Sequence, residues 1–250
     1  MQRQIKIIVE YRGTSFAGWQ VQPGQETVQG ALEEAVFRVT GQRVAVIGAG
    51  RTDAGVHSLG QVASFRIDHQ LEADRFRDAL NFYLPDDIRV KDSEEASPEF
   101  HPIRDARTRR YRYLLSQQRS ALYRDLRWEY PVELNPDKLH KAAAVVVGEH
   151  DFAPFCVVSS RKEDNVCRIE QSRWRTVGPL WIYEIRGDRF LHSMVRSLVG
   201  AMVNIAEENS DNNPLNLTLE KFSDIINSPT EERVAFTAPS HGLYQVSVGY

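Results

Sequence analysis

The order of apolar patterns in the first hundred residues constrains the fold more than any other feature of this sequence. Residues 5–9 alternate apolar with polar or mixed positions, which is typical of a strand. Apolar residues then recur at helical spacing over residues 28–39. Thr27 precedes this repeat as the predicted N-cap, and Gly41 follows it as the residue that ends the helix.

Four further elements are predicted before residue 100. Residues 44–47 and 62–67 read as strands, residues 73–83 as a second helix, and residues 88–90 as a short strand. The order is therefore β-α-β-β-α-β. This order predicts a ferredoxin-like sheet with helices on one face.

The second half of the chain repeats this pattern loosely. Its predicted strands and helices are, in order, residues 111–115, 135–147, 174–176, 181–185, 192–207 and 243–250. The simplest interpretation is an α+β protein of two tandem halves, residues 1–103 and 104–250.

Composition excludes several classes of protein. With 42% hydrophobic and 26% charged residues the chain is an ordinary globular sequence, and no apolar run is long enough to span a bilayer. The N-terminus shows no signal-peptide pattern, so we expect a cytoplasmic protein. Cys156 and Cys167 are the only cysteines and are expected to be reduced packing residues.

A net charge of −3 gives no global signature of a nucleic-acid partner, but one local run is strongly basic. Its arginines are Arg104, Arg107, Arg109, Arg110 and Arg112. Arginine suits bidentate phosphate contacts, yet such a run also protects an exposed edge strand from pairing. On composition the two interpretations are equally good.

The glycine-rich stretch GAGRTDAGVH, residues 48–57, matches none of the common cofactor motifs. Asp53 stands where a dinucleotide fingerprint needs its third glycine, and no Lys followed by Ser or Thr completes a Walker loop. The seven histidines have no metal-ligand spacing. We therefore expect neither a cofactor nor a metal.

Asp53 itself has two interpretations. An aspartate beside glycine most often bonds to nearby backbone amides in a turn. However, Gly48, Gly50 and Gly55 would let another molecule approach the loop closely. A carboxylate in such a position can act as a nucleophile or a base without any cofactor.

Seven segments in order along the chain carry a family resemblance. They are YRGTSFAGWQVQP (11–23), TVQGALE (27–33), GRTDAGVHSLGQVASF (50–65), RRYRY (109–113), GEHDF (148–152), FLHSMVR (190–196) and TAPSHGLYQVSVGY (237–250). The chain resembles the TruA family of tRNA pseudouridine synthases.

This resemblance implies an enzyme without metal or cofactor that isomerises uridine in the anticodon stem-loop of tRNA, at tRNA positions 38, 39 and 40. It also implies a homodimer. The implied fold has two tandem ferredoxin-like or RRM-like halves, which form one extended antiparallel sheet with flanking helices and a cleft between the halves.

The resemblance also assigns roles to residues. Asp53 corresponds to the essential carboxylate, either as nucleophile at the ribose C1′ or as base for the 2′ proton. An ionised aspartate buried against a nucleotide is costly unless it is paired, and Arg196 corresponds to its partner. Tyr111 corresponds to the aromatic residue that stacks on the flipped uracil and helps remove the C5 proton. Leu243 corresponds to the opposite wall of the pocket, and Arg51 to a residue that fixes the flipped nucleotide.

Each of these residues also has an ordinary structural interpretation. Tyr111 fits a core aromatic on a strand, Arg196 a charge on a helix surface, and Leu243 a packing leucine. Their joint occurrence in family order favours the functional interpretation. The basic run then gains a role, because Arg107 and Arg110 lead into the Tyr111 strand and are expected to contact RNA phosphates.

The sequence departs from the family pattern in three places. Arg12 replaces an acidic residue in the first block, and Arg104 is shifted by one position, which in an extended chain turns it to the opposite face. The polar and acidic segment 207–217 replaces a basic, glycine-rich turn. An RNA-binding module without catalysis remains the main alternative, and a glycosidase is weaker because no second carboxylate stands in the matched blocks.

Overall fold

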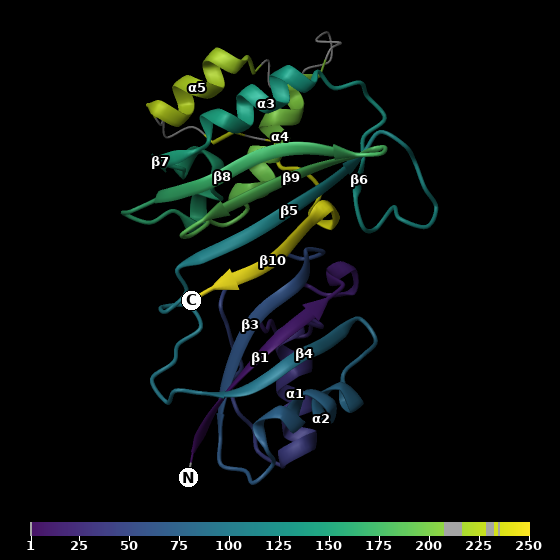
Figure 1. Cartoon of the computed structure of the whole chain (residues 1–250), viewed down its shortest axis with the longest axis vertical. Helices are drawn as coiled ribbons and strands as arrows, with labels where there is room; N and C mark the ends of the chain where they lie inside the picture. Colours follow the sequence, from purple (N-terminus) through teal and green to yellow (C-terminus); the bar gives the residue numbers. More distant parts are fainter. Residues whose placement is uncertain (1, 208–216, 229–232, 235) are drawn as a thin grey trace. The chain divides into compact units, whose positions relative to one another are not determined.

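The structure is a computed structural model that describes residues 2–207, 217–228, 233–234 and 236–250. It divides into two compact units (Figure 1). Unit 1 comprises Met1–Arg107 together with Tyr244–Tyr250, and unit 2 comprises Thr108–Leu243. The sequence predicts residues 104–250 as one half, whereas residues 104–107 and 244–250 group with unit 1.

The core of unit 1 is built on strand β1 (Arg3–Tyr11), which lies between two antiparallel neighbours. Ile5 pairs with Phe65 of β3 (His57–Ile67) and with Glu95 of β4 (Ile88–Ala96). Ile5, Ile7 and Val9 of β1 are fully buried, as the alternating pattern predicts, whereas Ile8 on the other face is only partly buried.

The other edge of β3 is shared by two strands. β2 (Ile47–Gly48) pairs antiparallel with β3 at Ser64 and Ala63. β10 (Leu243–Gly249) pairs parallel with β3, with Tyr244 opposite His57. The strand order in unit 1 is therefore β4-β1-β3, followed by β2 and β10 along one edge.

Two helices of unit 1 pack their apolar residues into this core. In α1 (Val28–Thr40), Leu32 and Val36 are fully buried, and in α2 (Phe76–Tyr83) so is Leu80. α1 begins where predicted, because the Thr27 side chain accepts a hydrogen bond from the Gly30 N–H, and Gly41 ends it with φ 73°. Figure 1 shows α1 and α2 beside each other.

Unit 2 contains a sheet with strand order β5-β9-β8-β7. The four strands are antiparallel neighbours: β5 (Thr108–Ser116), β9 (Leu180–Gly187), β8 (Val166–Val177) and β7 (Gly148–Asp151). The short β6 (Trp128–Glu129) runs parallel to the end of β5. The predicted pair of strands in 174–176 and 181–185 is confirmed as parts of β8 and β9.

Three helices of unit 2 lie together on one side of β7, β8 and β9 (Figure 1). They are α3 (Pro136–Val145), α4 (Met194–Ala206) and α5 (Leu219–Asn227). Of these, α4 is buried along nearly its whole length, and the indole of Trp174 donates to the Met202 sulfur across the interface between sheet and helix. Short 3₁₀ helices lie at Ala153–Phe155, Val158–Ser160 and Ser240–Gly242.

The fold is α+β, as the sequence predicts, but its pairing is mixed. The expectation of an antiparallel sheet is wrong at two places, because β10 is parallel to β3 and β6 is parallel to β5. Neither pairing joins sequence neighbours through a tight hairpin, so the local pattern contains no signal for its direction. Among the described residues, no helix is long and apolar enough to cross a membrane.

Candidate active site

Asp53 lies in the loop between β2 and β3. Two hydrogen bonds hold the loop residues that precede it. The Ala49 N–H donates to the Val62 carbonyl over 2.8 Å. The side-chain amide of Gln61 donates to the Gly50 carbonyl over 2.7 Å. Both contacts fix the loop to β3.

The residue immediately before Asp53 is held from two sides. The Trp19 N–H donates to the Thr52 carbonyl over 3.1 Å, and the hydroxyls of Tyr11 and Thr52 lie 2.8 Å apart. Tyr11, Trp19 and Thr52 are all buried. The backbone that carries the carboxylate of Asp53 is therefore preorganised by the interior of unit 1.

A turn follows at once. The Val56 N–H donates to the Asp53 carbonyl over 3.2 Å, and Gly55 has φ 80°, a conformation that favours glycine. This bond uses the Asp53 backbone, while its side chain is half-buried.

Gly48 serves internal packing, which corrects our expectation for this one glycine of the loop. A Cβ on Gly48 would lie 2.5 Å from the Trp19 ring, so this glycine makes room for an indole of the same unit. A Cβ on Gly13 would lie 1.9 Å from the Val56 carbonyl oxygen, and one on Gly18 would lie 2.6 Å from that of Thr52. The glycines of YRGTSFAGW thus let that segment lie directly against the Asp53 loop.

His57 is a positioning residue that sequence reasoning missed. Its ring is 1% exposed, accepts a hydrogen bond at Nδ1 from the Gly13 N–H over 3.1 Å, and stacks on Tyr244 with centroids 4.7 Å apart. It thereby connects the start of the chain, the Asp53 loop and β10. Motif spacing alone contains no signal for such a contact.

In unit 2, Tyr111 lies on β5 opposite Ile185 of β9. Its ring is 9% exposed and meets the edge of Phe190 at a centroid distance of 5.1 Å and an interplanar angle of 79°. Phe190 belongs to the FLHSMVR block. The resemblance blocks that contain Tyr111 and Arg196 are therefore in contact through these two aromatic rings.

Tyr113, two residues further along β5, fixes the segment that leads to Leu243. Its hydroxyl donates to the Pro239 carbonyl over 2.8 Å, and a Cβ on Gly242 would lie 2.5 Å from its ring. Burial raises the pKa of Tyr113, and the positive charge of Arg196 acts against this increase. Leu243 follows Gly242 and is 6% exposed.

Arg196 is the third residue of α4 and is half-buried. Its Nε donates to the Ala238 carbonyl over 2.8 Å, and the Ala238 N–H donates back to the Arg196 carbonyl over 3.1 Å. The guanidinium is therefore oriented by the TAPSHG segment. The interpretation of Arg196 as an ordinary helix-surface charge does not describe this environment.

The remaining predicted binding residues are dispersed. Arg51 is exposed beside Asp53 in unit 1. Arg107, also exposed in unit 1, donates its backbone N–H to the Gly249 carbonyl over 2.8 Å. Arg110 lies in unit 2, where its guanidinium contacts Glu184 at 3.3 Å. Residues 208–216 of the acidic segment lie outside the described part of the chain.

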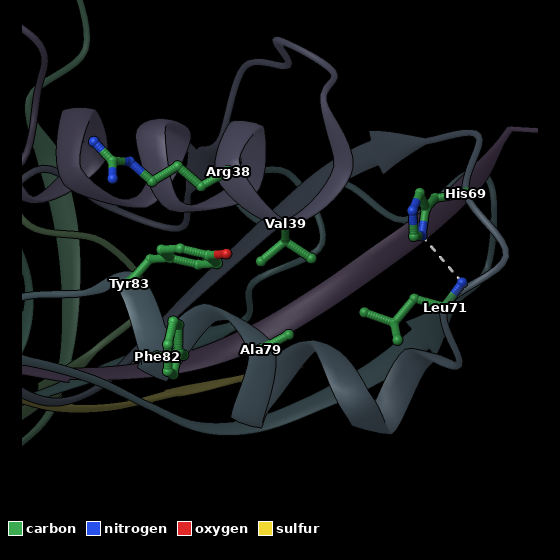
Figure 2. A pocket seen from close by; sticks show the side chains of 7 residues that line it. All are labelled: Arg38, Val39, His69, Leu71, Ala79, Phe82 and Tyr83. Atoms are coloured by element: carbon green, nitrogen blue, oxygen red, sulfur yellow. Dashed lines mark hydrogen bonds between the residues drawn. The ribbon is translucent and has the colours of Figure 1, made fainter.

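The structure thus describes Asp53 with Arg51 in unit 1, and Tyr111, Arg196 and Leu243 in unit 2. Within the described ranges, no group of three or more His, Cys, Asp or Glu residues is arranged to hold a metal ion. A surface groove between α1 and α2 includes none of these residues (Figure 2). It is lined by Arg38, Val39, His69, Leu71, Ala79, Phe82 and Tyr83.

Known proteins resemble this chain along its whole length. The tRNA pseudouridine synthase family matches residues 7–103 and 142–250. A protein named tRNA pseudouridine synthase A from Acetivibrio thermocellus is 40% identical over 99% of this chain and 100% of its own. A protein of the same name from Geobacter sp. strain M21 is 38% identical over 99% of both chains. Another, from Pelobacter propionicus, is 37% identical over 99% of this chain and 100% of its own. This chain therefore belongs to the tRNA pseudouridine synthase family.

Proposed function

We propose that this protein isomerises uridine to pseudouridine in the anticodon stem-loop of tRNA, with no metal or cofactor. The observation that carries the proposal is the rigid seating of Asp53. Its loop is held by Tyr11, Trp19 and Gln61, in a chain whose residues 7–103 and 142–250 match the family. A solvent-exposed turn aspartate would not need this support.

The reaction breaks the bond from ribose C1′ to uracil N1 and forms a bond from C1′ to C5. N1 gains a proton, and the proton at C5 is lost to water, so the product is an isomer of the substrate. Asp53 supplies the carboxylate, either by attack at C1′ or by removal of the 2′ proton. Both roles require an ionised carboxylate close to the ribose.

Arg196 is proposed as the cation that pairs with Asp53. Its support is the hydrogen bond to Ala238, which fixes the guanidinium and reduces the entropy lost when a partner is bound. Tyr111 is proposed to stack on the flipped uracil, and its contact with Phe190 supports a fixed ring plane. Leu243 is proposed as the opposite wall of the pocket.

Substrate binding and assembly extend this proposal. Arg51 is proposed to hold the flipped nucleotide, and Arg107 and Arg110 to contact phosphates. We further propose that the two units are tandem ferredoxin-like halves whose sheets continue into one another around a cleft. In this account the enzyme is a cytoplasmic homodimer.

The experiment that tests this function is direct analysis of the product. An unmodified tRNA transcript is incubated with the protein, digested to nucleosides and chromatographed for pseudouridine. We expect the wild type to form pseudouridine and Asp53→Asn to form none, whereas Asp86→Asn, which changes an exposed aspartate paired with Arg89, retains activity. Tight tRNA binding without product would instead favour an RNA-binding module.

A further inference from the structure

One face of the unit 2 sheet is occupied by arginines around a single buried carboxylate. Side chains alternate along a strand, so Arg110 and Arg112 of β5 point to the face opposite Tyr111 and Tyr113. Across the sheet, Glu184 of β9 lies directly between Arg112 on one side and Arg173 of β8 on the other. The helices pack on the Tyr113 face instead, as the Trp174 contact with α4 indicates.

The carboxylate of Glu184 is surrounded on both of its oxygens. Oε1 lies 3.3 Å from the guanidinium of Arg110 and 3.1 Å from that of Arg112. Oε2 lies 2.9 Å from that of Arg173 and 3.6 Å from that of Arg175. We refer to these five residues as the Glu184 cluster.

The charges of the cluster do not cancel. Four arginines and one glutamate, 4 − 1, leave a formal charge of +3. Burial raises the pKa of Glu184, but hydrogen bonds from Arg173 and Arg112 outweigh this effect and hold the pKa at about 2. The glutamate is therefore ionised at neutral pH, and the excess positive charge comes from the arginines.

The positive charge is also the part of the cluster that solvent can reach. The Glu184 side chain is 3% exposed, whereas those of Arg112, Arg110, Arg175 and Arg173 are 29%, 37%, 39% and 56% exposed. The carboxylate therefore lies beneath the guanidiniums and orders them. Each guanidinium has five N–H donors in a fixed plane. The four guanidiniums together therefore have more donors than the two oxygens of one carboxylate can accept.

We propose that the Glu184 cluster is a phosphate-binding surface for the tRNA substrate, separate from the site of the flipped base. The inference rests on the proposed function for the identity of the RNA. Preordered guanidiniums with a net positive charge complement a phosphate backbone. Because the cluster and Tyr111 lie on opposite faces of β5, it contacts a part of the tRNA other than the target nucleotide.

A second copy of the chain is a poorer occupant of this face. A two-fold contact centred on this face would bring one +3 cluster against its copy, and like charges placed together across an interface repel each other. Arg186 and Glu170, which pair at 2.7 Å beside the cluster, add no net negative charge. The charge balance therefore favours a polyanion.

The test removes charge on β8, away from the residues proposed for catalysis. Arg173→Gln with Arg175→Gln lowers the formal charge of the cluster from +3 to +1 and leaves Arg110 and Arg112 on Glu184. Binding of unmodified tRNA to the full chain is measured by fluorescence anisotropy over a series of salt concentrations. We expect the slope of log K against log salt to become shallower by roughly 1.4 to 1.8, as loss of two phosphate contacts predicts.

The matched control is the pair Arg77→Gln with Arg89→Gln, which removes two exposed arginines that are likewise paired with carboxylates, but in unit 1. Its slope should be that of the wild type. Arg173→Lys with Arg175→Lys should restore most of the slope, and kcat at saturating tRNA should remain within about twofold of the wild type in all these variants.

An unchanged slope in the folded Gln variant would overturn the proposal. If the Gln variant with an unchanged slope also loses a dimer in sedimentation, the face binds a second copy of the chain instead of RNA. The binding measurement needs no turnover. A wild type that forms no pseudouridine would therefore refute the proposed function, while a slope that changes as expected would still support the cluster as an RNA-binding surface.

Discussion

At the scale of single residues, the contact between Tyr11 and Thr52 is the most direct support of the Asp53 loop. Removal of the buried hydroxyl in Tyr11→Phe leaves the Thr52 hydroxyl without this partner at 2.8 Å. We expect a loss of about 1 to 2 kcal/mol in the free energy of unfolding. We also expect a fall in kcat on the order of tenfold, because a small displacement of a reacting group is costly. Urea denaturation and pseudouridine formation measure the two effects.

Tyr83→Phe is the control for this change, because Tyr83 is 44% exposed and lies in the groove between α1 and α2 (Figure 2). It should alter neither quantity. Equal loss of kcat in both variants would show that the Tyr11 hydroxyl has no particular effect on the Asp53 loop.

Glu184 makes stability depend on acid pH in a defined direction. Its pKa in the folded protein is about 2, below the ordinary value of 4.5. The stabilisation is therefore complete above about pH 4.5 and is lost as the pH falls towards about 2; the shift corresponds to about 3 kcal/mol. We expect the free energy of unfolding of Glu184→Gln to fall less steeply with acid than that of the wild type.

Urea denaturation at a series of pH values from about 6 to about 3 measures this difference. Glu34→Gln, which changes a largely exposed glutamate paired with Arg38, should follow the wild-type curve. Parallel curves for Glu184→Gln and the wild type would contradict the assignment.

How far the candidate site could be predicted differs from residue to residue. Asp53 could be singled out as a candidate from its loop alone, since a charged residue among glycines is unusual. Tyr111, Arg196 and Leu243 could be singled out only through the family resemblance. His57 and Glu184 were not identified, because their contacts join residues distant in sequence, such as Glu184 with Arg112 and His57 with Gly13.

At the scale of secondary structure, the first helix shows how well a local signal works. Thr27 was predicted as its N-cap and occupies that position, where its hydroxyl accepts from the Gly30 N–H over 3.2 Å. We expect Thr27→Ala to destabilise the protein by about 1 kcal/mol and Thr27→Ser to have little effect. Urea denaturation would test both, and equal stability of the two variants would contradict a capping role.

The strands next to the Asp53 loop were predicted less well. The strand expected at residues 44–47 is confined to Ile47–Gly48, and β3 begins at His57 rather than at residue 62. The first residues of β3 are buried against β10, which comes from the far end of the chain. No pattern within a short window contains that information.

At the scale of the whole molecule, the last strand closes unit 1. Besides the pairing of Tyr244 with His57, Gln245 donates to Gln61 over 3.1 Å, and the Tyr250 hydroxyl donates to the Pro102 carbonyl over 2.9 Å. Deletion of residues 244–250 should therefore loosen the start of β3 and, with it, the Asp53 loop.

Hydrogen exchange measures this effect. We expect backbone amides of residues 57–61 to exchange faster after the deletion, while those in the helices of unit 2 keep their rates. Ser247→Ala, at an exposed position of β10, should leave exchange in β3 unchanged. Equal protection of β3 with and without the last strand would contradict the assignment of residues 244–250 to unit 1.

The central claim is that Asp53 carries out the isomerisation, and release of tritium from tRNA labelled at uridine C5 tests it most directly. The label leaves only when C5 loses its hydrogen, so the signal reports bond formation at C5 rather than binding. We predict release by the wild type and by Asp86→Asn, and none by folded Asp53→Asn that still binds tRNA. Release by Asp53→Asn at the wild-type rate would contradict the account.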